Sequence, residues 1–78
     1  MSNVSLSHFK SRFAEELEIT DLETLEASLD SISEFDSMGK LVISVLIEEL
    51  FGIQIEYEIL ESQETLEELY EYCVLSGS

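Results

Sequence analysis

The sequence contains no proline and no tryptophan, and it has only three glycines and one cysteine among its 78 residues. Because proline breaks helices and glycine destabilises them, a chain with so few of either can be helical over most of its length. The single cysteine, Cys73, excludes a disulfide within the chain and, among apolar neighbours, is expected to be a small buried side chain. No apolar run approaches the roughly 18 residues of a membrane span, so we expect none.

Basic residues are also scarce, because three Lys and Arg stand against 18 Asp and Glu, a formal net charge of −15. A nucleic-acid backbone is bound by clusters of Lys and Arg, so we expect no nucleic-acid partner. Basic protein surfaces are the expected complement. Self-repulsion should oppose compaction, and salt should relieve it by screening.

The first eight residues lack the basic region and the apolar stretch of a secretory signal. Together with the single cysteine, this predicts a reduced, cytoplasmic protein. The length predicts one domain over 1–78, with 76–78 as a frayed tail, and we expect a monomer. The acidic segments at 21–23 and 30–32 lack the donor spacing and central glycine of a calcium loop, so no specific metal site is expected.

Apolar residues recur at helical spacing, which predicts an all-α fold: a small bundle of three main helices plus one short helix. The main helices are expected over about 5–17, over 37–51, and from the capping-box sequence at 65–68 onward. A short helix is expected over 57–61, after an extended connector at 53–55. Ser5 is the expected cap of the first helix, and Gly52 the expected left-handed end of the second.

The connection over 18–35 is long, but it contains neither glycine nor proline. Its large aliphatic residues are spaced three or four apart, which predicts one or two helical turns within it. We expect four side chains to fix this connection on the core: Leu22, Leu25, Leu29 and Ile32. Aromatic side chains expected in the core are Phe9, Phe13 and Phe51.

Ser37 is the most informative position, because it stands where an irregular acidic segment meets the longest periodic run of the sequence. Asp36, one residue earlier, is a strong N-cap type whose carboxylate can accept backbone N–H bonds. A narrow polar stripe of the helical wheel holds Ser37, Lys40, Ser44 and Glu48. Apolar residues cover much of the remaining circumference: Met38, Leu41, Val42, Val45, Leu46 and Leu50. The sequence therefore predicts a hydroxyl that is fixed in the first helical turn and exposed.

The surroundings of Ser37 do not predict an enzyme. A serine nucleophile needs an adjacent base and an oxyanion hole, and no histidine or glycine-rich turn lies near Ser37 in the sequence. The only histidine, His8, belongs to the first helix, where a surface position is expected. Two roles for Ser37 stay open: an attachment point modified by a separate enzyme, or an ordinary first-turn serine.

The tripeptide Asp36-Ser37-Met38 resembles the Asp-Ser-Leu attachment site of acyl carrier proteins and peptidyl carrier domains. The resemblance covers nearly the whole chain, since it includes the length, the acidity, the run over 48–53 and a last helix around 65–69. A second Asp-Ser pair stands at Asp30-Ser31. Only Ser37 leads directly into the long periodic run, so Ser37 is the predicted site.

The resemblance implies that a phosphopantetheinyl transferase moves 4′-phosphopantetheine from coenzyme A to Ser37, with Asp36 as the helix cap beside the site. The thiol of this arm would hold an acyl or aminoacyl group as a thioester. The implied partners are an acyl or aminoacyl ligase, transferase or synthase with a basic docking surface. The residues implied as their contacts are Met38, Glu48 and Glu49, and Lys40 on the same helix is a further expected contact.

The sequence departs from the fatty-acid type of carrier at Gly39, Lys40 and Val42, where acidic or polar residues are common in that group. Phe35 before Asp36 resembles the aromatic-Asp-Ser pattern of D-alanine carriers and carriers of specialised pathways. A different class of function also stays open. An unmodified acidic helical interaction module would use the same glutamate-rich faces to bind a basic partner.

Overall fold

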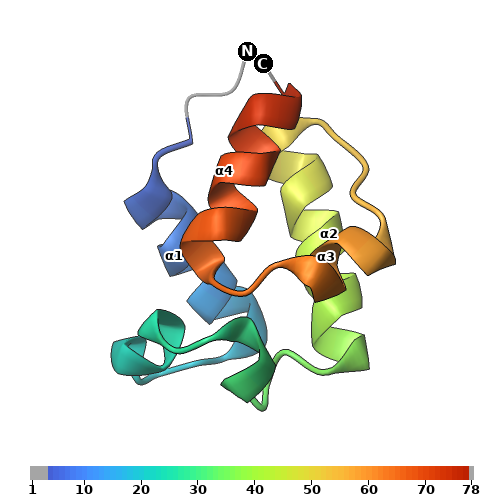
Figure 1. Ribbon diagram of the computed structural model, residues 1–78. Helices are drawn as coiled ribbons and strands as arrows, with labels where there is room; N and C mark the ends of the chain where they lie inside the picture. Colours follow the sequence, from blue (N-terminus) through green and yellow to red (C-terminus); the bar gives the residue numbers. More distant parts are fainter. Residues whose placement is uncertain (1–3, 78) are drawn as a thin grey trace.

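The computed structural model describes residues 4–77, and within that range the chain forms four α-helices and two short 3₁₀ helices without a strand (Figure 1). In chain order they are α1 (Leu6–Leu17), η1 (Leu22–Glu26), η2 (Leu29–Ser31), α2 (Ser37–Phe51), α3 (Tyr57–Ser62) and α4 (Leu66–Gly77). This confirms the predicted all-α bundle of three main helices and one short helix.

The helix ends follow from local capping chemistry. Ser5 Oγ accepts the His8 N–H at 3.1 Å and so caps α1, as predicted. Gly52 ends α2 with a φ of 72°, the left-handed conformation expected there. α1 ends in the same way at Glu18, a non-glycine residue with a φ of 57°, which the sequence analysis did not predict.

The start of α4 shows the predicted capping box, except that its second hydrogen bond comes from the residue before Thr65. Thr65 Oγ1 accepts the Glu68 N–H at 3.2 Å, and the Glu68 carboxylate accepts the Glu64 N–H at 3.1 Å. α4 then continues through Gly77. The fraying of 76–78 stays a prediction, and Ser78 lies outside the described residues.

Aromatic rings from three helices meet at the centre of the bundle. Phe9 packs edge-on against Phe13, with ring centroids 6.3 Å apart, and against Phe51, with centroids 5.7 Å apart. All three are buried, as predicted. The Tyr70 hydroxyl donates to the Val4 carbonyl at 2.7 Å, which ties α4 to the segment before α1.

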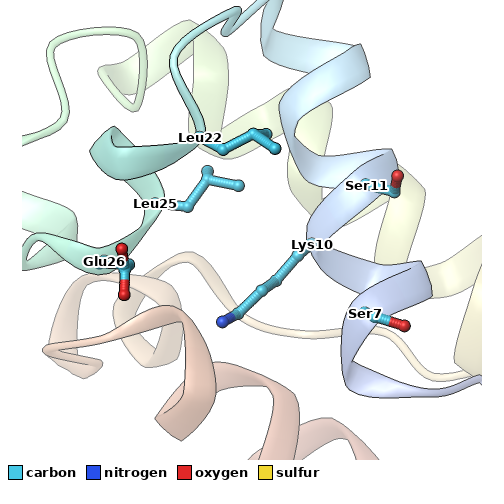
Figure 2. Close-up of a pocket in the computed structure, with 6 residues that line it drawn as sticks. All are labelled: Ser7, Lys10, Ser11, Leu22, Leu25 and Glu26. Carbon is cyan, nitrogen blue, oxygen red and sulfur yellow. The ribbon is translucent and has the colours of Figure 1, made fainter.

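Three of the four aliphatic residues predicted to fix the connection between α1 and α2 lie in the core: Leu25, Leu29 and Ile32. The fourth, Leu22, is 65 % exposed, so the prediction that it is buried was wrong. Its side chain lines an open cavity of about 320 Å³ that residues of α1 and η1 share (Figure 2), so solvent reaches it. The Leu29 N–H donates to the Glu64 carbonyl at 2.7 Å, which fixes η2 beside the start of α4.

Each of the two lysines joins two helices. Lys10 Nζ on α1 lies 3.3 Å from Glu67 Oε2 on α4, and Lys40 Nζ on α2 lies 3.8 Å from Glu61 Oε2 on α3. Arg12 pairs instead with Glu16 of its own helix, at 3.0 Å. All three basic residues are therefore paired with carboxylates of the chain itself.

Cys73 provides a test of the packing. Its side chain is fully buried on α4, and burial raises the pKa of its thiol from 9.0 to about 12. Because the thiolate is the nucleophile, we predict that the native protein does not react with an aromatic disulfide reagent at about pH 8, and that urea exposes the thiol. Absorbance of the released aromatic thiolate measures the rate of reaction of Cys73 without urea and with urea.

The same shift predicts the direction of the alkaline response. As pH rises from 9 towards 12, the unfolded chain loses its thiol proton before the folded chain does, so the free energy of unfolding falls in this window. Rapid reaction of Cys73 in the native protein would contradict the buried position.

Candidate functional site

Ser37 is the first residue of α2, and its side chain is exposed. Asp36 is the N-cap: its Oδ1 accepts the Gly39 N–H at 2.9 Å, and its carbonyl accepts the Lys40 N–H at 2.8 Å. These bonds hold the first turn on both sides of the serine. No hydrogen bond joins the Ser37 hydroxyl to another residue of the described range 4–77, so its oxygen is not engaged by the fold.

Gly39 lets the preceding segment pack directly on α2. A Cβ placed on Gly39 would overlap the carbonyl oxygen of Glu34 and would lie 3.3 Å from Leu17 Cδ2. The obstructing atom belongs to the backbone, so it cannot move aside as a flexible side chain can. In the sequence, Gly39 stands out only as a departure from the fatty-acid type. The available signal was a glycine in the first turn of an apolar helix, which costs about 1 kcal/mol relative to alanine.

Phe35 anchors the same segment from the other direction. Its side chain is buried, and its ring centroid lies 5.5 Å from that of Phe13 on α1. Asp36 and Ser37 therefore follow directly after a residue that is fixed in the core. In the sequence, Phe35 stands out only as part of an aromatic-Asp-Ser pattern, whereas the structure gives it a packing role.

Lys40 lies one turn after Ser37, and only 16 % of its side chain is exposed. Its ammonium lies over two rings, 5.6 Å from the centroid of Phe35 and 5.5 Å from that of Tyr57 on α3. With the ion pair to Glu61, these contacts hold α3 beside the first turn of α2. The contact of Lys40 with a partner enzyme stays a prediction.

The exposed face of α2 differs from the polar stripe of the helical wheel. Met38, Leu41 and Val45 are 70 %, 56 % and 65 % exposed, whereas Lys40 and Ser44 of the polar stripe are partly buried. The reason is that α1, α3 and α4 all contact α2 and bury the side that carries Ile43 and Ile47. Apolar residues occupy so many positions of this helix that their pattern alone could not orient it.

Met38, Leu41 and Val45 form a continuous strip on one side of the helix, since their spacing is i, i+3 and i+7. We call it the apolar stripe of α2. It begins next to Ser37 and leads towards Glu48 and Glu49, whose side chains are exposed near the C-terminal end of the helix. Ser37 thus lies at one end of an exposed surface that is apolar first and acidic further on.

The alternative serine has a different environment. Ser31 lies in η2, a helix of three residues, and its Oγ is 2.6 Å from Ser28 Oγ. Its hydroxyl is therefore engaged in a local hydrogen bond. Its environment also lacks a long helix, because η2 ends at Ser31.

Within residues 4–77, the histidine does not lie beside Ser37. His8 is exposed in the first turn of α1, and the starts of α1 and α2 lie on opposite sides of the molecule (Figure 1). Within the described residues, no three His, Cys, Asp or Glu side chains are arranged to hold a metal ion. The search of the same part of the chain for a helix long and apolar enough to cross a membrane found none.

Comparison with protein-family models gives a match to the family described as "phosphopantetheine attachment site", over residues 7–73. The chain belongs to this family. The matched region runs from α1 into α4 and includes Ser37. Comparisons with curated proteins and with solved structures gave no match.

Members of the phosphopantetheine attachment site family carry 4′-phosphopantetheine covalently, and they interact with modifying and biosynthetic enzymes. Carrier domains of this family are not catalytic themselves. The residues around Ser37 fit such a group, because the hydroxyl is exposed, unengaged by residues 4–77 and held on a short, well-bonded turn.

Gly39→Ala tests the close packing beside Ser37. At an ordinary helix position this change would stabilise the protein by about 1 kcal/mol. Because the new Cβ would collide with the Glu34 backbone, we predict the opposite sign, a loss of about 1–2 kcal/mol in the free energy of unfolding. Urea unfolding followed by circular dichroism measures it.

Val45→Ala is the control, since Val45 lies exposed on the same helix and its truncation should change stability by less than about 0.5 kcal/mol. A stabilising Gly39→Ala substitution would show that the backbone of Glu34 does not press on α2.

Proposed function

We propose that the protein is an acyl or aminoacyl carrier whose 4′-phosphopantetheine is attached to Ser37. The observation that carries the proposal is the exposed Ser37 hydroxyl, which is held in the first turn of α2 yet is unengaged by residues 4–77. The family match supports it, because Ser37 lies within the matched residues. Ser31 offers a hydroxyl that is already hydrogen-bonded.

Attachment requires only a hydroxyl from this chain, because a separate phosphopantetheinyl transferase with its own magnesium supplies the catalysis. The Ser37 oxygen bonds to the phosphorus that carries pantetheine in coenzyme A, and the bond from this phosphorus to adenosine 3′,5′-bisphosphate breaks. The hydroxyl proton passes to a base of the transferase. The bound arm then supplies a thiol that holds the cargo as a thioester.

We propose that partner enzymes dock on α2. The apolar stripe lies next to Ser37 and offers exposed apolar area of the kind that marks interaction sites. Glu48 and Glu49 would pair with basic residues further along, which suits ligases, transferases or synthases with a basic docking surface. Met38 belongs to the stripe, and Lys40 lies at its edge with its ammonium turned towards α3.

The proposal also covers the chemical class of the cargo and the location and oligomeric state of the protein. The Phe35-Asp36 sequence is similar to that of D-alanine carriers, but the burial of Phe35 against Phe13 gives this aromatic residue a packing role that is independent of cargo. The proposal therefore extends to acyl and aminoacyl groups alike. A monomeric, cytoplasmic protein is part of the same proposal.

An unmodified acidic interaction module is the second candidate, and the exposed apolar stripe favours it as much as it favours a carrier. The two functions differ in one measurable property. Only the carrier requires a covalent change at Ser37.

Intact mass spectrometry after incubation with coenzyme A, magnesium and a promiscuous phosphopantetheinyl transferase separates them. We predict the gain of one phosphopantetheine by the wild type and by Ser31→Ala, and no gain by Ser37→Ala. Ser31→Ala is a matched control, because it also removes an exposed serine hydroxyl that follows an aspartate. Unchanged mass with several transferases would favour the interaction module.

Charge reversal of Glu48 and Glu49 to lysine tests the docking surface. We predict that the association rate with the transferase falls roughly tenfold at low salt and recovers towards the wild-type value at high salt, because steering by exposed charges is screened. Stopped-flow kinetics at two salt concentrations measures it.

Glu23→Lys is the control, since Glu23 is exposed on η1, away from α2 in the chain. Equal association rates of the Glu48/Glu49 variant and wild type at low ionic strength would remove these residues from the interface.

A further inference from the structure

The ammonium of Lys40 has capacity for a further partner. Its only carboxylate neighbour among the described ion pairs is Glu61, at 3.8 Å, which is longer than the roughly 2.7–2.9 Å of a strong charged hydrogen bond. Its other neighbours are the faces of Phe35 and Tyr57, which attract the charge without accepting a conventional hydrogen bond. An ammonium has three donors, so these contacts do not saturate it.

Lys40 also lies on the side of α2 where Ser37 lies. The two residues are three apart in the helix, a spacing that brings Cβ atoms within about 5–6 Å. Helical side chains lean towards the N-terminus of the helix, and the position of the Lys40 ammonium 5.6 Å from the ring of Phe35 agrees with this direction. The Lys40 ammonium is thus displaced towards the N-terminal end of α2, where the residues that precede Lys40 lie.

The site needs a positive charge once Ser37 is modified. A phosphodiester adds one negative charge beside the carboxylate of Asp36, on a chain that already carries −15. The other two basic residues, Lys10 and Arg12, lie on α1 and pair with Glu67 and Glu16. Lys40 is therefore the one base on the helix that bears Ser37.

We propose that Lys40 is the counter-charge of the phosphodiester on Ser37: its ammonium turns from the ring faces and pairs with the modified serine. This inference rests on the proposed function and adds a role for Lys40 that is internal to the protein. The consequence is a coupling between modification and stability. Attachment at Ser37 stabilises the fold through Lys40, and salt weakens the effect.

A thermodynamic cycle measures this coupling. Unmodified and phosphopantetheinylated forms of wild type, Lys40→Met and Lys10→Met are unfolded in urea, which leaves charges unscreened. Methionine keeps an apolar stem while it removes the charge. We expect attachment to raise the folded-to-unfolded ratio of wild type and Lys10→Met by roughly two- to fivefold more than that of Lys40→Met at low salt.

Lys10→Met is the matched control, because it removes an equal charge and an equivalent interhelical ion pair, with Glu67, on another helix. If attachment changes the stability of Lys40→Met and wild type equally, the inference is overturned while the carrier function stands. If intact mass shows no attachment to Ser37, the carrier function and the inference both fall.

A second measurement uses the wild type alone and does not depend on how well the variants fold. The chain contains two lysines, Lys10 and Lys40, so a carbon–proton spectrum of protein labelled at lysine Cε resolves both. Attachment should shift the Lys40 signal and leave that of Lys10 in place. A Lys40 signal that does not move on attachment would overturn the inference.

Discussion

The close approach of the Glu34 backbone to Gly39 is the constraint on which the site depends. Any side chain on Gly39 would overlap the Glu34 carbonyl, so the segment before α2 can lie on the helix only because this residue is glycine. With Phe35 buried in the core, the chain reaches Asp36 in a fixed direction, and its carboxylate can cap the helix. Ser37 then stands exposed on a turn held from both sides.

Charge imposes the second constraint. With 18 acidic residues against three basic ones, most carboxylates repel one another, and helix packing has to overcome this repulsion. The two lysines offset part of this repulsion between helices, because each forms an ion pair with a neighbouring helix. Lys10 joins α1 to α4, and Lys40 joins α2 to α3. The acidic surface that disfavours compaction is also the surface that a basic partner enzyme would recognise.

Sequence reasoning predicted what depends on local chemistry. Ser5, Asp36 and Gly52 mark helix ends through capping, and these bounds were confirmed. It did not predict features that depend on distant parts of the chain. Leu22 is exposed where it lines an open cavity shared with α1, and the role of Gly39 follows from the Glu34 backbone packing against α2. The orientation of α2 was also missed, because nearly every side of that helix carries apolar residues.

Hydrogen exchange of the Gly39 amide in the unmodified protein reports whether the turn that bears Ser37 is held. This N–H lies in the first turn of α2, where helix amides have no partner within the helix, so its protection depends on the Asp36 carboxylate 2.9 Å away. We expect it to exchange as slowly as amides in the middle of α2. Exchange at the rate of an unstructured peptide would mean that the turn bearing Ser37 is not held.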